Sequence, residues 1–278
     1  MTQYFSVALL FLSALGASNT TGAWPEAKPE ACTQTRVVRI PVHTQGAQET
    51  AEAMDESPAA LIVSPGAAEE PPEGPSSFDV FEDGSLLIND PLRHRISVFD
   101  PQGKVLHVWK IGFAADHITV LPNDLVLVSE ASTGELHVFD REGQPRPAEK
   151  AVSPEPAESH VLTANKATIK RPPTGELLEV LFDRPGLRLL SLENLATDHD
   201  GNIYVTLEST AKGDASEGIN VNKYVRKYAA DGKLVCEITN IPLDYYVTPV
   251  DELRVRNKIV YQLVTTGTEV RINEWATE

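Results

Sequence analysis

The chain has 278 residues, of which 41% are hydrophobic and 23% are charged, and its formal net charge is −16. This length and apolar content suffice to bury a substantial core, either in one large all-β domain or in two smaller ones. The charged fraction is ordinary for a globular protein and argues against wholesale disorder. Such a negative field repels phosphate backbones, and no basic run offsets it, so we expect no nucleic-acid partner.

The first 23 residues contain no charged side chain and include an apolar stretch over residues 5–17. This stretch is too short to span a bilayer as a helix, and small residues that offer cleavage points follow it. The pattern predicts a signal peptide over 1–23, and therefore a secreted or periplasmic protein whose mature chain is not stably inserted in a membrane. No Lys or Arg precedes the apolar run, which leaves a buried N-terminal element as the alternative.

The chain has two cysteines, Cys32 and Cys236. In an exported protein this even number permits one disulfide between them, whereas in the cytosol both would be free thiols. Neither belongs to a CxxC motif or has a His at metal-ligand spacing, so a cysteine metal site is not expected.

The region before residue 78 divides into three parts. Residues 24–35 are expected to form a loose leader, and the alternating RVVRIPV at 36–42 predicts a strand. Residues 44–77 then carry seven acidic residues and no basic ones, together with several Pro, Gly and Ala. This composition predicts a long acidic loop, with a short strand possible at LIV, 61–63.

From Phe78 onward, short apolar runs alternate with turn residues in a repeating order. The clearest copy, at residues 78–109, reads FDVFEDGSLLINDPLRHRISVFDPQGKVLHVW and contains four such runs. Similar units begin near residues 116, 158, 194 and 251, a spacing of roughly 35–55 residues that is typical of β-propeller blades. The third unit has blurred turns, and its strands are predicted at HVLTA, TIKR, ELLEVLFD and LRLLSL.

Two turn signatures recur in these units. An Asp-Gly pair follows the first strand, at Asp83-Gly84 and Asp200-Gly201, and the patterns FDPQG, FDREG and YAADG follow the third. Glycine adopts positive φ without steric cost, and Asp or Asn caps a turn locally, so both signatures predict antiparallel hairpins.

The last unit stops after three strands, and strand 36–42 has the right length to complete it. An array of four-stranded sheets around an axis must close, or its terminal sheets expose apolar faces. We therefore predict an all-β fold: a β-propeller of four-stranded antiparallel blades spanning 36–278 as one domain. Five blades are expected, or six if 44–77 or the third unit contains another. A β-sandwich with a separate meander, or a solenoid, are the alternative folds.

The segment FDVFEDGSLLINDPLRHRISVFDPQGKVL resembles an NHL-type propeller repeat, and ATDHDGNIYVTLE with RKYAADGKL is similar to a second copy interrupted by an insertion. The resemblance implies that Asp90, which ends the second strand, and Arg95, which opens the third, form a structural pair at the corner. It implies little about activity, because propellers include enzymes and binding modules alike.

In a propeller, the loops that join fourth to first strands and second to third strands share one face, which is the usual ligand face. The insertion 209–222 belongs there, as do the candidate ligand-face residues His117, His160, Glu130, Glu208, Tyr245 and Tyr246. Carboxylates and imidazoles around an axis could hold Ca²⁺ or Zn²⁺, as in gluconolactonase-like propellers, but no local motif fixes such a set. We therefore expect no cofactor and leave a metal open.

No motif for nucleophilic catalysis is present, since the chain has no GxSxG and no Gly-rich phosphate loop. The expected function is accordingly non-catalytic: an exported propeller that binds a protein, peptide or glycan at its loop-rich face. An axial-metal hydrolase or lactonase is the alternative, and a structural module of a cell-envelope assembly is the second.

Overall fold

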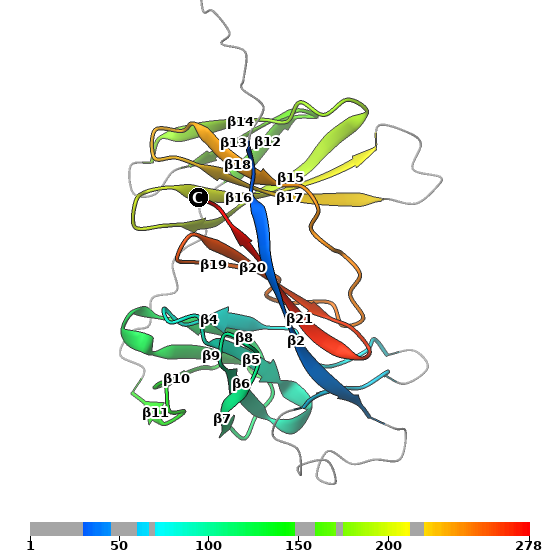
Figure 1. The fold of residues 1–278 in the computed structure, drawn as a ribbon, viewed down its shortest axis with the longest axis vertical. Coiled ribbons are helices and arrows are strands. Elements are labelled where there is room, and N and C mark those ends of the chain that lie inside the picture. The colour runs from blue at the N-terminus through cyan, green and yellow to red at the C-terminus, as the bar shows by residue number, and fades with distance from the viewer. Residues whose placement is uncertain (1–29, 46–59, 67–69, 148–158, 171–174, 212–219) are drawn as a thin grey trace, which may run out of the picture.

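The computed structural model describes residues 30–45, 60–66, 70–147, 159–170, 175–211 and 220–278 (Figure 1). In this part of the chain the secondary structure is almost entirely β, and the strands form five sheets. No helix in the described ranges is long and apolar enough to cross a membrane. The predicted signal peptide over 1–23 lies outside the described residues.

The first two sheets are antiparallel meanders of consecutive strands, as the sequence predicts for the units near 78 and 116. The first contains β4 (Phe78–Val80), β5 (Leu86–Asp90), β6 (Arg95–Phe99) and β7 (Val105–Lys110). The second contains β8 (Ala115–Val120), β9 (Val126–Glu130), β10 (Leu136–Phe139) and β11 (Pro145–Arg146). Short 3₁₀ helices lie at Pro91–Arg93 and Pro122–Asp124.

The third and fourth sheets divide the chain differently from the prediction. The third has three strands, β12 (Ser159–Thr163), β13 (Lys166–Lys170) and β14 (Leu177–Leu181). The fourth contains β15 (Leu187–Thr197), β16 (Ile203–Ala211), β17 (Val221–Tyr228) and β18 (Leu234–Ile238), and β1 (Glu30–Ala31) pairs parallel with β18.

The segment LRLLSL was predicted to be the fourth strand of the third unit, and this is wrong. It is the first half of β15, an 11-residue strand that pairs with β16 and so belongs to the fourth sheet. The physical reason is that no Gly or Pro interrupts the chain between Gly186 and Asp198, so LRLLSL and the following ENLAT form one continuous strand.

The fifth sheet combines the two ends of the chain. It contains β19 (Leu253–Arg256), β20 (Ile259–Thr265), β21 (Glu269–Ala276), β2 (Thr33–Thr44) and β3 (Leu61–Val63). β2 pairs antiparallel with β21 and occupies the fourth-strand position, which is where the sequence places 36–42. It begins at Thr33, so part of the predicted leader 24–35 is strand, and the predicted LIV strand of the acidic loop pairs parallel with β2.

The sheets pack in an order that differs from their order in the chain. Along the long axis in Figure 1, β4–β11 lie at one end, β19–β21 with β2 in the middle, and β12–β18 at the other end. Successive contacts join the first strands β8, β4, β19, β15 and β12. A row of sheets joined through their first strands is a propeller-like arrangement.

A separate apolar core lies between each pair of adjacent sheets. The second and first sheets share a core around Trp109 and Phe139, and the first and fifth share one that includes Phe78 and Ile40. Trp275 belongs to the core between the fifth and fourth sheets. A further apolar core lies between the fourth and third sheets. Because Val38 and Ile40 of β2 are buried in the second of these cores, the N-terminal strand is part of the packed interior.

The predicted turns form through the expected chemistry. The carboxylate of Asp100 accepts hydrogen bonds from the amides of Gln102 and Lys104, at 2.9 and 2.8 Å. The hairpin between β19 and β20 has two consecutive residues of positive φ, Asn257 at 50° and Lys258 at 61°. That combination defines a type I′ turn, whose twist matches the right-handed twist of the paired strands.

Cys32 and Cys236 form a disulfide, as the sequence permits. Cys32 lies between β1 and β2, and Cys236 is buried in β18. The bond therefore links the N-terminal segment to the fourth sheet, while β2 itself belongs to the fifth. The same segment spans the junction of two sheets.

Asp90 and Arg95 lie opposite each other at the corner of β5 and β6, and both are buried. Arg95 Nε donates to Asp90 Oδ2 at 2.8 Å, and Arg95 Nη2 donates to the carbonyl of Ala60 at 2.9 Å. His94 between them adopts a left-handed φ of 50°. The pair joins this corner to the segment before β3, and neither group faces solvent.

Candidate functional site

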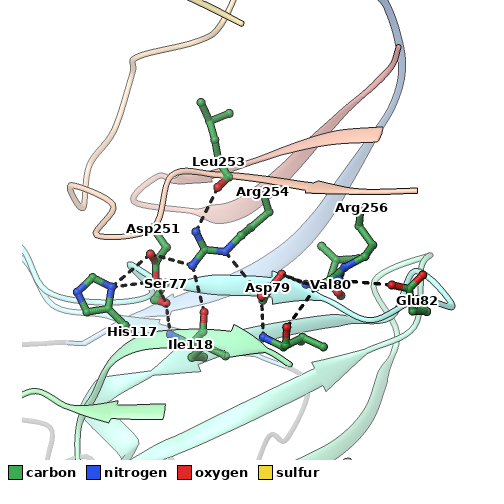
Figure 2. Close-up of polar contacts among 11 residues, drawn as sticks. Ser77, Asp79, Val80, Glu82, His117, Ile118, Asp251, Leu253, Arg254 and Arg256 are labelled. Atoms are coloured by element: carbon green, nitrogen blue, oxygen red, sulfur yellow. Dashed lines mark hydrogen bonds and ion pairs between the residues drawn. The ribbon is translucent and has the colours of Figure 1, made fainter. Parts of the chain in front are cut away.

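The inner edges of three first strands, β4, β8 and β19, meet in a polar cluster (Figure 2). The sequence of β19 explains its charge. Leu253 is buried in the core shared with the fourth sheet, whereas Arg254 and Arg256, on the alternate positions, point toward β4 and β8. This is the two-residue periodicity of a strand with one apolar and one polar side.

Side chains from β4 and its preceding residue satisfy the amides on the inner edge of β8. Ser77 Oγ accepts from the Ile118 amide at 2.9 Å, and Asp79 Oδ2 accepts from the Val120 amide at 2.7 Å. Burial raises the pKa of Asp79, and the guanidinium of Arg254 opposes that shift. Asp79 is thus held by backbone donors at a sheet junction, with its side chain closed off from solvent.

The two arginines of β19 satisfy the carbonyls of the same edges. Arg254 Nη2 donates to the Ile118 carbonyl at 3.1 Å, and Arg256 Nε donates to the Val80 carbonyl at 3.0 Å. Both guanidinium groups also lie within 3.8 Å of the Asp79 carboxylate. The side chains of this cluster therefore provide the hydrogen bonds that a neighbouring strand would provide to these backbone groups in a continuous sheet.

Ser77, Asp251 and His117 come together in this cluster, but not in the geometry of a catalytic triad. Ser77 Oγ donates to the Asp251 carboxylate, and His117 Nδ1 lies 3.2 Å from the same carboxylate. A triad needs the serine on the other imidazole nitrogen, where the histidine can take its proton. Here Nε2 of His117 lies 3.7 Å from Asp116 instead, and Ser77 is fully buried. The arrangement provides no activated nucleophile.

A second polar network lies between the fourth and fifth sheets. The hydroxyl of Tyr245 donates to Glu252, which also pairs with the ammonium of Lys223. Lys223 Nζ lies 3.0 Å from Glu208, and Gln262 Nε2 donates to the Tyr245 hydroxyl at 2.9 Å. Two predicted candidates, Glu208 and Tyr245, are thereby connected through residues that the sequence analysis did not select.

The protonation of this network does not favour acid–base catalysis. Burial raises the pKa of Tyr245, and the Glu252 carboxylate raises it further. Burial acts to lower the pKa of Lys223, but Glu252 and Glu208 outweigh it and hold that pKa above its ordinary value. At neutral pH the phenol and the ammonium therefore keep their protons, so both are hydrogen-bond donors and neither is a base.

A cavity of about 420 Å³ lies where the fourth, fifth and first sheets meet. We call it the hairpin cavity, because it is bounded by residues at the carboxyl ends of β15, β19 and β4 and by the turns that follow them. Its lining consists of Glu82, Ala196, Thr197, Asp198, His199, Asp200, Val255, Arg256, Asn257 and Lys258. The predicted ligand face lies at the amino ends of the first strands, so this cavity is at the other end of the sheets.

The polar groups of the hairpin cavity are arranged by turn chemistry. Asp198 accepts from the amide and the side chain of Asn202, at 2.9 and 2.8 Å. Burial acts to raise the pKa of Asp198, but the Asn202 bonds outweigh it and lower that pKa. Lys258 Nζ lies 2.8 Å from Asp200 Oδ2, and this carboxylate raises the pKa of Lys258. The cavity rim therefore presents both anionic and cationic groups at neutral pH.

The remaining predicted ligand-face residues are dispersed. Glu130 ends β9 near His137 of β10, and Tyr246 lies beside Tyr245 in the connection to β19. His160 is on β12 opposite Thr168, and its side chain lies outside the described residues, as does the centre of the insertion, 212–219. The predicted set is consequently not a single site.

Sequence reasoning missed the residues that connect these groups, above all Asp251, Glu252 and Arg254. The signal was present in DELRVRNK, residues 251–258, where polar residues alternate with Leu253 and Val255. That alternation predicts one polar side for the strand. The partners on that side come from positions more than 100 residues away, as the 136-residue separation of Arg254 and Ile118 illustrates.

No protein-family profile matches the sequence, and no curated protein matches it. Among solved structures, the chain is similar to a gluconolactonase from Xanthomonas campestris, with 11% identity, coverage of 87% of this chain and 98% of that one, and a TM-score of 0.34. It is also similar to virginiamycin B lyase from Staphylococcus aureus, with 10% identity, coverage of 73% and 94%, and a TM-score of 0.29. It is similar as well to a DUF4221 family member from Bacteroides vulgatus, with 9% identity, coverage of 69% of this chain and 75% of that one, and a TM-score of 0.29. At this level of similarity no activity is transferred.

Proposed function

We propose that the chain is an exported, non-catalytic β-propeller that binds a short glycan in the hairpin cavity. The five sheets are its blades, β2 closes the last of them, and the repeats are of NHL type. The succession of first-strand contacts and the Asp-Gly turn signatures support this architecture. The Cys32–Cys236 disulfide supports export, since such bonds persist mainly in oxidising compartments.

The state of the polar cluster in Figure 2 supports a non-catalytic role. Asp79 and Arg256 are bound to backbone groups of adjacent strands, and Ser77 is buried against Asp251. Groups that react with a substrate need an accessible donor or acceptor, and these are engaged in holding sheets together.

The hairpin cavity is the observation that carries the binding proposal. Its volume of about 420 Å³ falls within the range of small-molecule sites. Asp200 and Glu82 supply acceptors, Lys258 supplies a donor, and Val255 adds an apolar wall. A sugar presents hydroxyls that both donate and accept, and an apolar face between them. A glycan of one or two residues therefore matches this lining better than an extended peptide or a purely anionic ligand.

The test uses thermal shift and isothermal titration of the mature chain with glucose, galactose, N-acetylglucosamine, maltose, cellobiose and glucuronate. At least one of these saccharides is expected to bind. Lys258→Gly removes the ammonium while keeping positive φ at its turn position, and Asp200→Asn removes the carboxylate charge. Each should weaken that binding by about 10- to 100-fold, the loss of one charge-assisted hydrogen bond.

Asp231→Asn is the matched control, because Asp231 precedes Gly232 as Asp200 precedes Gly201, yet it lies in another turn of the same sheet. It should bind like the wild type. Two results contradict the proposal. One is that none of the six saccharides binds at about 10 mM. The other is that one binds and Lys258→Gly and Asp200→Asn leave its affinity unchanged.

A further inference from the structure

We infer that Glu130, Glu135 and His137 form a binding site for a divalent transition-metal ion such as Zn²⁺. The three residues lie in the second sheet, where β9 ends and β10 begins, and not in the hairpin cavity. The inference is therefore independent of the proposed glycan site.

The hairpin between β9 and β10 brings the three side chains to one face. The amide of Glu130 donates to the carbonyl of Glu135 at 2.9 Å, so these two residues lie across from each other. His137 follows Glu135 by two positions, and residues two apart in an extended segment point to the same side. Leu136 between them is directed to the opposite face and pairs with Ser129.

The donor atoms of the three residues lie close together, and two of them have the spacing that a shared metal ion requires. One ligand atom from each residue lies within 4.8 Å of the others. His137 Nε2 lies 3.5 Å from Glu130 Oε2, which is long for a hydrogen bond between nitrogen and oxygen. Two ligands that each bind Zn²⁺ at about 2.1 Å with a tetrahedral angle are about 3.4 Å apart. The imidazole and the carboxylate are thus separated by the distance that a shared ion requires.

Neighbouring groups orient these ligands. The ring of Phe113 stacks on His137, with 4.4 Å between centroids, and so fixes the plane of the imidazole. Ser132 Oγ donates to Oε1 of Glu130 at 2.6 Å, which leaves Oε2 directed at the histidine. Among the described residues, the Nε2 atom of His137 is shielded from solvent, and its ion-pair partner is Glu130 at 3.5 Å. A ligated metal would satisfy this nitrogen, and such outer contacts are typical of metal sites.

The donor set selects the kind of metal. When they bind a metal, two carboxylates and one imidazole contribute a charge of −2, which a divalent cation balances. Ca²⁺ prefers six to eight oxygen ligands, whereas an imidazole with carboxylates suits Zn²⁺. Three protein ligands leave a fourth position for water.

The experiment titrates the full chain, stripped with EDTA and dialysed, with Zn²⁺ in competition with a chromophoric chelator. One ion should bind per chain, and Co²⁺ in its place should give the intense visible bands of a four-coordinate site. His137→Gln and Glu135→Gln should each weaken Zn²⁺ binding by at least about 100-fold, and Ser132→Ala by about 10-fold. Glu135 is exposed, so its variant retains the fold.

His107→Gln is the matched control, because His107 is an exposed strand histidine in the neighbouring sheet. Its affinity for Zn²⁺ should equal that of the wild type. The inference is overturned if no Zn²⁺ binds below about 1 mM, or if Glu135→Gln and His137→Gln bind Zn²⁺ as tightly as His107→Gln.

Discussion

Removal of the disulfide tests whether the N-terminal segment holds the sheets together. The perturbation is the double variant Cys32→Ala/Cys236→Ala. The two cysteines are separated by 204 residues, so the bond closes a loop that contains the first three sheets and most of the fourth. Outside the bond, the segment is held by β1, which pairs over two residues, and by the longer pairing of β2 with β21.

The loop length sets the expected magnitude. In the chain-entropy description, a cross-link over this separation lowers the free energy of the native state relative to the unfolded state by about 5 kcal/mol at 25 °C. Measured values for native disulfides are commonly about 2–5 kcal/mol, because the unfolded chain retains some structure. For a chain of this size, each kcal/mol corresponds to about 2–4 °C in Tm. We therefore expect the variant to melt about 4–20 °C below the oxidised wild type.

Urea unfolding and calorimetry of the oxidised wild type and the variant give this difference. Wild-type protein with a phosphine reductant separates the cross-link from packing, since its thiols still fill the site at Cys236. The free energy of unfolding of the reduced wild type should lie within about 1 kcal/mol of that of the variant. The reductant should not change the free energy of unfolding of the variant. If oxidised wild type and variant differ by less than about 0.5 kcal/mol, the cross-link does not constrain the unfolded chain and the reasoning is refuted.

Three further predictions follow from local geometry. Gly143 has a φ of 80°, and a Cβ there would lie 2.3 Å from an indole ring. Gly143→Ala should therefore lower the free energy of unfolding, measured in urea, by about 2–4 kcal/mol. Gly134→Ala, with φ of 70° and no atom within 4 Å of its Cβ, should lose only the backbone part, about 1–2 kcal/mol. Burial acts to raise the pKa of Asp251, but the adjacent guanidinium and hydroxyl outweigh it and lower that pKa. Its ionised form therefore stabilises the fold above the ordinary Asp pKa. The gap in unfolding free energy between wild type and Asp251→Asn should narrow below about pH 4, and a gap constant from pH 7 to 3 would contradict this. Tyr245→Phe should cost about 1–3 kcal/mol, because it removes a donor to a carboxylate, whereas Tyr246→Phe should change stability by less than about 0.5 kcal/mol. Equal losses in the two tyrosine variants would show that the phenol bond contributes nothing.

Local signals in the sequence predicted the fold where a turn needs particular residues. Asp100 and its glycine form the expected turn. The pairing of β2 with β21 could be anticipated because the last unit lacks a fourth strand, a count that needs no contact information. The prediction for the third unit was wrong because its turns carry no Asp-Gly signal. It placed a boundary between LRLLSL and the next strand, whereas the structure has one continuous strand there.

The same distinction between local and distant information applies to the sites. Asp90 and Arg95 are five residues apart on adjoining strands, so a repeat pattern is enough to pair them. Ser77 and Asp251 are 174 residues apart, and only the packing of the fifth sheet against the first brings them together. The spacing of residues in a single sequence does not predict this contact. The hairpin cavity was missed for the same reason, since three sheets contribute to it.

β19 connects the hairpin cavity to the polar cluster between the first strands. The residues that flank β19 reach different groups. Glu252, just before the strand, binds Tyr245, and Lys258, two residues after it, lines the hairpin cavity. Between them, Arg254 and Arg256 donate to carbonyls on the inner edges of β8 and β4. An edge strand with free carbonyls and amides needs partners, and charged side chains are a recognised way to protect one.

In this protein the innermost strands thus satisfy one another through side chains, because they lie too far apart to pair as a sheet. The guanidinium groups suit this role, since each offers several donors in a fixed plane. It follows that Arg254→Lys, which keeps the charge, should still lose stability. A lysine has one nitrogen in place of three. It cannot contact the Ile118 carbonyl and the Asp251 carboxylate, as Arg254 Nη2 does at 3.1 and 2.8 Å, and also reach the positions of Nε near Asp79 and of Nη1 at the Leu253 carbonyl.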